Sequence, residues 1–424
     1  MTDASDALSV TTRRKIVRRL LPLLFMIYVI AFVDRVNIGY AGLDMTRELH
    51  FSNEVFGFGT GIFFAGYCLL EIPGALLAQG WSARKWLAAI MVVWGTLASL
   101  TGLIHTATQF NFIRFFVGLA EGGMFPAMIV YLTHWFRHED RAKSMSLFMV
   151  AVPFATAFGG MISGRLLSLH WLGLAGWRWV LILEGAPAVI IGIVAFFYMT
   201  DWPQDARWLS TSERVWIMAE LERENLNKQN DQPDLSILAA LRQPVVLLLA
   251  CSYFCSNLTV YGLIFWLPKM VQKFGGLSNL QISLVASIPY LCTIPAMLIV
   301  SWHSDKTGER RWHTALAMFA AALGLVISQL PGVGPYVAMA GFSMAVMGVL
   351  TYLPCFWTIP TRVLSPAVAA AAVGFITLGN LGGFAGPYAI GFLTDLTGTY
   401  VAGMLLLIAA ATTSGLLVLR LRVR

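Results

Sequence analysis

The sequence predicts an all-α membrane protein with twelve transmembrane helices in two six-helix bundles. Of its 424 residues, 58% are hydrophobic and only 12% are charged, a balance that excludes an ordinary soluble domain. Apolar stretches long enough to cross a bilayer recur along the chain, and one long polar segment divides them into two groups of six. Because lipid offers the backbone no hydrogen bonds, these stretches are expected to be helices.

The twelve stretches follow one another with short connections except at that polar segment. They are expected at about 20–42, 55–79, 86–105, 109–133, 144–167, 178–199, 243–268, 281–302, 313–331, 335–359, 367–390 and 399–420. The two bundles then comprise residues 20–199 and 243–420, with a basic arm at 1–19, a linker at 200–242 and a tail at 421–424. The first stretch lacks a cleavage pattern, so it is expected to stay in the protein as a span.

Lys and Arg residues gather in alternate connections, which predicts the orientation of the chain. They occur in the N-terminal arm, the linker and the tail, and in loops that include Arg84, Lys85, Lys306, Arg310 and Arg311. Under the positive-inside rule both termini are cytoplasmic, and the protein is expected in the inner (plasma) membrane of the cell. The net charge of +7 is therefore interpreted as a topology signal and as contact with the lipid bilayer, with no nucleic-acid partner.

The linker contains a segment with apolar residues at helical intervals. Val215, Met218 and Leu221 predict an amphipathic helix on the cytoplasmic surface. Thr211 or Ser212 is expected to cap its start.

Two loops echo each other, because Arg84-Lys85 follows the second span where Arg310-Arg311 follows the eighth. Such a repeat is typical of transporters whose two bundles rock about a central cavity. The segment DKTGERR, from Asp305 to Arg311, resembles the D-x-x-G-x-R-R loop of the major facilitator superfamily. Further segments resemble its anion:cation symporter family, in order along nearly the whole chain: FVDRVNIGYAG at 32–42, YCLLEIP at 67–73, RFFVGLAEGGMFP at 114–126, GWRWVLILEGAP at 176–187 and NLGGFAGPYAIG at 380–391.

The resemblance implies a carrier that imports organic anions such as sugar acids, tartrate or aromatic carboxylates, usually with protons. It implies that Glu121 is a proton-carrying acid, and it favours substrate binding for Tyr67 and Asn380. It also implies a gating role for the two loops, with Arg84, Lys85, Asp305, Gly308, Arg310 and Arg311. The first loop departs from the family pattern at Gln79 and Ser82, where an acid and a Gly are common, so weaker gating contacts are expected there than around Asp305.

Adjacent charges, Asp34 and Arg35, lie near the middle of the first span. A charge at bilayer depth costs roughly 2.5–3.5 kcal/mol on insertion scales, which favours a functional role for both. The planar guanidinium of Arg35 matches a substrate carboxylate, and the alternative is a salt bridge to a neighbouring helix. Asp34 is able to bind a proton and a basic partner in turn, and its alternative is a permanent ion pair.

The fourth span repeats this pattern. Arg114 and Glu121 lie seven residues apart, hence on one helical face and roughly 10 Å apart along the axis. Arg114 is a second candidate for binding an anion, whereas the alternative for Glu121 is a packing hydrogen bond. Glu71 and Glu184 each precede a kinking Pro, and a structural role is expected for both.

Uncharged polar residues extend the candidate substrate site. Tyr28 lies two turns before Arg35 on the same face, and the seventh span carries a polar stripe of Tyr253, Asn257 and Tyr261. Trp357 is either a cavity wall or an ordinary interface anchor. The candidate substrate-binding residues are Arg35, Tyr28, Tyr67, Arg114, Asn257, Trp357 and Asn380, and the candidate proton-coupling residues are Asp34 and Glu121.

These residues predict a proton-coupled importer of a small organic anion that works by alternating access. An anion exchanger or uniporter that keeps its acids in ion pairs is the alternative. The sequence has no H-E-x-x-H or G-x-S-x-G motif and no selectivity-filter repeat, so neither an enzyme nor a channel is expected. The five cysteines lie in apolar stretches as inert thiols, no metal or other cofactor is expected, and we expect a monomer.

Overall fold

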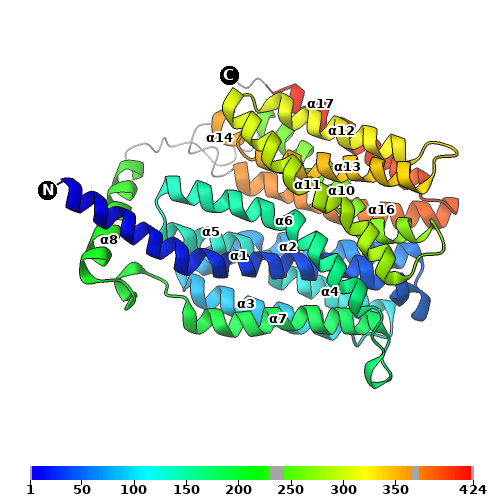
Figure 1. Ribbon diagram of the computed structural model, residues 1–424, viewed down its shortest axis with the longest axis horizontal. Helices are drawn as coiled ribbons and strands as arrows, with labels where there is room; N and C mark the ends of the chain where they lie inside the picture. The colour runs from blue at the N-terminus through cyan, green and yellow to red at the C-terminus, as the bar shows by residue number, and fades with distance from the viewer. Residues whose placement is uncertain (1, 230–242, 364–371, 422–424) are drawn as a thin grey trace.

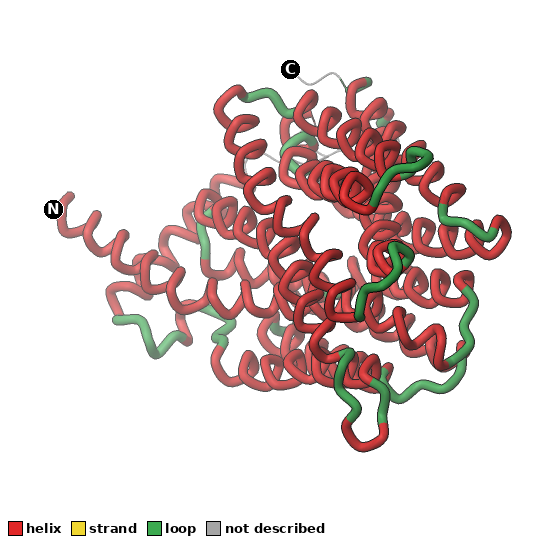
Figure 2. Tube along the Cα trace, turned by 45° about the vertical axis from the view of Figure 1, so that its right-hand side comes forward, coloured by secondary structure: helices red, strands yellow, loops and turns green. Residues whose placement is uncertain are grey.

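The computed structural model describes residues 2–229, 243–363 and 372–421, and this part of the chain is helical, with no strand (Figure 2). The second part of the predicted linker, the start of the predicted eleventh span and most of the tail lie outside the described residues. In chain order the elements are α1 (Thr2–Glu48), α2 (Asn53–Gly80), α3 (Ala83–Thr101), α4 (Ala107–Gly122), α5 (Met124–Trp135), α6 (His138–Leu166), η1 (Trp171–Gly173), α7 (Gly176–Tyr198), η2 (Pro203–Asp205), α8 (Thr211–Gln229), α10 (Pro244–Gln272), α11 (Asn279–Thr307), α12 (Arg311–Ser328), α13 (Pro335–Phe356), α14 (Pro360–Val363), η3 (Thr377–Leu381), α16 (Gly382–Thr397) and α17 (Val401–Leu419).

Among the described residues, 10 helices are long and apolar enough to cross a membrane, with α4 and α5 counted as one. The protein is therefore a multi-pass membrane protein. Two further helices, α3 and α16, fall short of the length or the mean hydropathy expected of a membrane span. Charged Arg84 and Lys85 lie in the first turn of α3 and lower its mean hydropathy, and α16 has only 16 residues.

The helices form two layers, α1 to α7 in one and α10 to α17 in the other, as the blue-to-green and yellow-to-red ribbons of Figure 1 show. Within the first layer α2 packs on α4, and glycines set how closely. A Cβ on Gly118 would lie 1.9 Å from the backbone oxygen of Phe63, and one on Gly122 would lie 2.2 Å from that of Tyr67. Small residues are what allow such an approach between helices in lipid. The contact fixes Glu121, between these glycines, against α1 and α2.

Helix α8 lies beside the first turns of α1 (Figure 1). Its cap is Ser210, because Ser210 N donates to Glu213 at 2.8 Å and Glu213 N donates to Ser210 Oγ at 3.3 Å. The expected caps, Thr211 and Ser212, were therefore one or two residues too late, since both lie inside the helix. Lys15 of α1 pairs with Glu213 at 2.6 Å, so the two helices are joined by charge.

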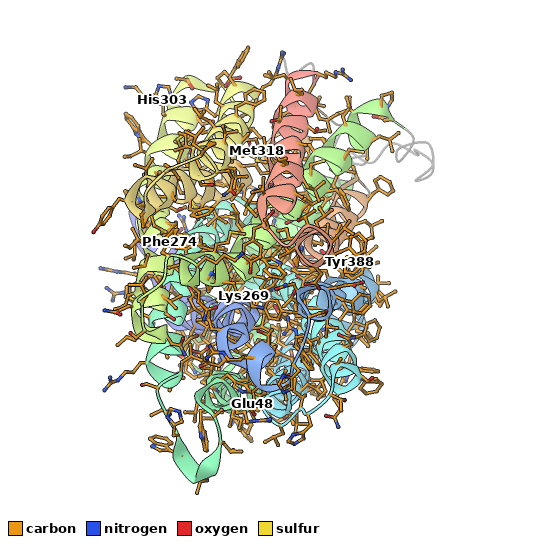
Figure 3. All side chains as sticks on the ribbon, turned by 90° about the vertical axis from the view of Figure 1, so that its right-hand side faces the viewer. Glu48, Lys269, Phe274, His303, Met318 and Tyr388 are labelled. Atoms are coloured by element: carbon orange, nitrogen blue, oxygen red, sulfur yellow. The ribbon has the colours of Figure 1, made fainter. Side chains whose placement is uncertain are left out.

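The two layers are joined at the end of the molecule remote from the N-terminus. Asp395 of α16 accepts hydrogen bonds from Asn53 Nδ2 and Glu54 N, both at 2.7 Å, at the start of α2. The Lys269 ammonium of α10 lies 4.1 Å from the ring centre of Phe56 of α2, and Figure 3 shows Lys269 near the boundary between the layers. A carboxylate at a helix N-terminus is favoured by the helix dipole. These contacts hold the two layers together at that end.

Candidate functional site

Arg35 and Glu121 form a buried ion pair between α1 and α4. Arg35 Nε donates to Glu121 Oε1 at 3.0 Å, and Arg35 Nη2 contacts the same oxygen. Arg35 is 6% exposed and Glu121 is 0% exposed, so both charged groups are shielded from water. The sequence predicted a functional role for each residue but did not predict that they pair.

The third donor group of Arg35 reaches the other layer. Nη1 donates to the hydroxyl of Tyr261, on α10, at 3.0 Å. The guanidinium also lies over the rings of Phe32, Phe63 and Tyr67, at 4.7, 5.4 and 5.1 Å from their centres. Cation–π contacts of this kind stabilise a cation that has lost its water. Arg35 is therefore held in an aromatic cage at the boundary of the two layers.

Asp34 points away from Arg35 and binds other partners. Its Oδ2 accepts a hydrogen bond from Trp94 Nε1 of α3 at 2.9 Å, and its Oδ1 accepts one from Asn37 Nδ2 at 3.2 Å. Neither partner carries a charge. Within the described residues Asp34 forms no ion pair, so its contacts do not favour the alternative of a permanent ion pair.

Arg114 is 3% exposed, and its guanidinium lies 4.9 Å from the ring centre of Phe63. Its Nε and Nη2 are buried without a hydrogen-bond partner among the described residues. Since buried donors in folded proteins are nearly always paired, these two N–H groups are suited to an acceptor that comes from outside the chain. A carboxylate has the two parallel oxygens that such a fork binds.

The remaining candidates lie around this centre or beyond it. Tyr28 packs against Phe32 with ring centres 5.0 Å apart, beside the cage of Arg35. Asn380, in η3, donates to Glu71 Oε2 of α2 at 3.4 Å, which is a further contact between the layers and agrees with a structural role for Glu71.

Two candidates on the α10 side make contacts of their own. Asn257 donates to the backbone oxygens of Tyr253 and Gly379 at 3.1 and 3.4 Å. Its amide therefore connects η3 to α10. Trp357 contacts the Tyr253 ring, with centres 5.1 Å apart. Of the predicted polar stripe, Tyr261 alone hydrogen-bonds to Arg35 within the described chain.

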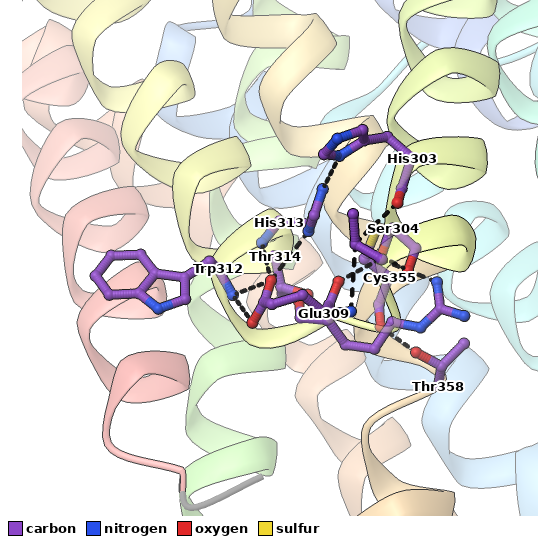
Figure 4. Close-up of polar contacts among 10 residues, drawn as sticks. His303, Ser304, Glu309, Trp312, His313, Thr314, Cys355 and Thr358 are labelled. Atoms are coloured by element: carbon purple, nitrogen blue, oxygen red, sulfur yellow. Dashed lines mark hydrogen bonds and ion pairs between the residues drawn. The ribbon is translucent and has the colours of Figure 1, made fainter. Parts of the chain in front are cut away.

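The loop after α11 forms a compact polar cluster (Figure 4). Gly308 ends α11 with φ +70°, a conformation that favours glycine. Arg310 pairs with Asp305 and donates to Ser304 Oγ at 2.9 Å, while Arg311 begins α12.

In the same loop, Glu309 accepts hydrogen bonds from Trp312 N at 2.8 Å and His313 Nδ1 at 3.0 Å. Burial alone would raise the pKa of Glu309, but these donors outweigh burial and hold its pKa below the usual value, so the Glu309 carboxyl is ionised at neutral pH.

The loop before α3 obtains its acid from a residue that the sequence did not single out. Asp201, just after α7, accepts hydrogen bonds from Ser82 Oγ at 2.7 Å and from Arg84 N at 2.9 Å. Arg84 Nε lies 3.6 Å from the same carboxylate, and Lys85 N donates to Ser82 Oγ at 3.1 Å. Asp201 therefore supplies the negative charge that Gln79 lacks, and the expectation that this loop makes weaker gating contacts than the loop around Asp305 stays a prediction.

We expect Asp201→Asn and Asp305→Asn each to lower the transport rate, because each removes a charge-assisted contact of its loop. Asp201 is largely shielded from water, so its contact contributes about 1.5–3 kcal/mol, whereas the exposed Asp305 contributes about 0–1 kcal/mol. Gln79→Ala should stay near wild type, since Gln79 is exposed. Initial rates at matched amounts of protein in the membrane check this. Equal losses for all three variants would contradict the role assigned to Asp201.

The chain matches the family model described as Major Facilitator Superfamily over residues 24–387. Among its relatives, "Putative tartrate transporter" of Agrobacterium vitis is 41% identical over 389 residues, which are 91% of this chain and 89% of the relative. "Inner membrane transport protein RhmT" of Escherichia coli K12 is 37% identical over 87% of this chain and 85% of its own. "Quinolone resistance transporter" of Acinetobacter baumannii is 34% identical over 92% of this chain and 90% of its own.

Solved structures share the fold at low sequence identity. The xylose transporter XylE from E. coli, in an inward open conformation, superposes with a TM-score of 0.70 at 14% identity, over 94% of this chain and 96% of that one. A bacterial homologue of the human lysosomal transporter Spinster, inward-facing and occupied, gives a TM-score of 0.71 at 17% identity, over 94% and 93% of the two chains.

A multi-pass bundle of two helical layers with a buried cluster of charges is typical of membrane transport proteins, and the family and the relatives matched here are transporters, not enzymes. With the family model matched over most of its length, the chain belongs to the Major Facilitator Superfamily.

Proposed function

We propose that this protein imports a small organic anion, a carboxylate or a sugar acid, together with protons by alternating access. In this proposal α3 and η3–α16 are the two spans that complete twelve, in two bundles of six. The protein acts as a monomer in the inner membrane, with the linker and both termini in the cytoplasm, as the placement of Lys and Arg favours.

The charge balance of the buried centre is the observation that most favours proton coupling. Arg35 and Arg114 face Asp34 and Glu121, and all four are at most 6% exposed. Their charges cancel when both acids are ionised, and an uncancelled buried charge is costly. An entering monoanion would leave the centre with one negative charge in excess, and one proton on either acid restores the balance. A dianion would require two protons, which is the number that the two acids hold.

The Arg35–Glu121 pair suggests how substrate and proton are linked. When Glu121 takes a proton, it loses the negative charge that binds Nε and Nη2 of Arg35. A substrate carboxylate is then able to replace Glu121 as the acceptor. Tyr261 is bound to the same guanidinium from the other layer, so the exchange of acceptors occurs where the two layers meet. Arg114 offers its two unpartnered N–H groups to a second oxygen-bearing group of the substrate.

A relative named as a putative tartrate transporter supports an organic anion as the substrate, and one named as an inner membrane transport protein supports the location. The ion pair itself favours the second candidate, an anion exchanger or uniporter. In that case Glu121 stays bound to Arg35 whenever substrate is absent, and no proton enters the cycle.

Uptake of labelled tartrate into proteoliposomes separates the candidates. A prior thermal-shift screen against organic acids selects another ligand if tartrate fails to stabilise the protein, because bound ligand stabilises in proportion to RT ln(1 + [L]/Kd). We expect accumulation when the outside is more acidic than the lumen, with Na⁺ replaced by choline. Equal uptake with and without the pH gradient, together with rapid counterflow, would contradict proton symport and favour the exchanger.

A further inference from the structure

A further buried carboxyl lies near Asp34 and takes no part in the centre described above. Glu184, on α7, is 5% exposed. Its Oε1 accepts a hydrogen bond from Ser163 Oγ of α6 at 2.8 Å, while its Oε2 is buried with no hydrogen-bond partner. A buried polar atom without a partner is uncommon in folded proteins and calls for an explanation.

Glu184 is hydrogen-bonded to Ser163 of α6, and the other groups near enough to interact with it electrostatically are Asp34, Asn37 and Tyr40 of α1. No cation is among them within the described ranges. Helix α3 also packs on α7, but its charged residues, Arg84 and Lys85, lie in its first turn. An ionised Glu184 would be a buried charge without a counter-ion and with a like charge beside it, which is the least favourable case for a carboxylate.

Asn37 joins the two carboxyls. Its Nδ2 donates to Asp34 Oδ1 at 3.2 Å, and the same side chain lies near the Glu184 carboxyl. Like Glu184 Oε2, Asn37 Oδ1 is buried without a partner. A proton on Glu184 Oε2 would supply the donor that both of these oxygens lack.

We propose that Glu184 stays protonated throughout transport and, by donating to Asn37, orients the Asn37 amide so that it donates to Asp34. Glu184 is thus a positioning residue for the acid beside the substrate site. Its role for Asp34 rests on the proposed function, whereas its protonation does not. Glu184→Gln keeps a donor for Asn37 and cannot ionise, so it should mimic the wild type. Glu184→Ala removes the donor and frees the amide to turn away from Asp34.

Infrared spectroscopy of the purified protein in lipid tests the proton directly. At neutral pH, the difference between wild type and Glu184→Gln should show the carbonyl stretch of a protonated carboxylic acid, which shifts in D₂O. Glu222→Gln, the same change at an exposed acid of α8, should remove carboxylate bands only. A difference spectrum for Glu184→Gln that contains carboxylate bands and no protonated carbonyl overturns the assignment.

The pH profile of uptake tests the positioning role. Glu184→Gln should keep the wild-type profile, and Glu184→Ala should move it to higher pH, because an Asp34 that has lost a donor holds its proton more strongly. Asn37→Ala removes the same hydrogen bond and should move the profile in the same direction, which covers the case that Glu184→Ala fails to fold. Ser163→Ala, which removes the other contact of Glu184, should leave the profile in place.

Loss of accumulation in Glu184→Gln would show that Glu184 releases its proton during the cycle and would overturn the proposal. An unchanged profile in both Glu184→Ala and Asn37→Ala would reduce Glu184 to a packing residue. If the wild type ignores the pH gradient, the proposed function fails on its own, and the infrared result still decides the protonation of Glu184.

Discussion

Glu121→Gln should abolish net accumulation of substrate while leaving exchange intact. A neutral amide resembles the protonated acid in size and in hydrogen bonding, but it has no proton to release. Arg35 then keeps a free positive charge in the empty carrier, and the return of that state across the membrane is disfavoured. Counterflow of labelled against unlabelled substrate avoids the empty state, so it should proceed near the wild-type rate.

Both measurements use one batch of proteoliposomes, with Glu222→Gln as the matched control on the surface of α8. Accumulation against a gradient by Glu121→Gln, driven by external acid, would contradict the coupling role. Coupling would then pass to Asp34, and Glu121 would be the counter-ion that holds Arg35 in place. Loss of both accumulation and counterflow would instead indicate that the Arg35–Glu121 pair is needed for the fold of the site.

Helical periodicity explains which of these features the sequence could predict. Asp34 and Arg35 are separated by about 100° on one helix, and this predicts that they do not pair, in agreement with their different partners. The same periodicity placed Arg114 and Glu121 on one face of α4 but gave no information about facing helices. The pairing of Glu121 with Arg35 depends on how α4 packs against α2 through Gly118 and Gly122, which is a tertiary contact.

Contacts between distant segments explain what the sequence left out. Asp201 reaches the start of α3 across more than a hundred residues of chain, and no local pattern marks it as the acid of that loop. Tyr261 and Asn257 lie on one predicted stripe, yet one binds the guanidinium of the first layer and the other binds backbone within its own layer. A stripe specifies a polar face, whereas the partner depends on depth along the helix.

Arg35→Lys should weaken substrate binding although it preserves the charge. The guanidinium directs separate N–H groups to Glu121 and Tyr261 and lies flat within an aromatic cage, whereas an ammonium is a compact point charge that cannot form two parallel hydrogen bonds to one carboxylate. Loss of one charge-assisted hydrogen bond, worth about 1.5–3 kcal/mol, corresponds to a rise in Kd of roughly tenfold to a hundredfold. Calorimetric titration of the ligand found in the thermal-shift screen measures this, and Arg223→Lys on the exposed face of α8 is the matched control. If Arg35→Lys binds and transports like the wild type, Arg35 is a structural counter-ion of Glu121, and the substrate carboxylate is to be sought at the unpartnered N–H groups of Arg114.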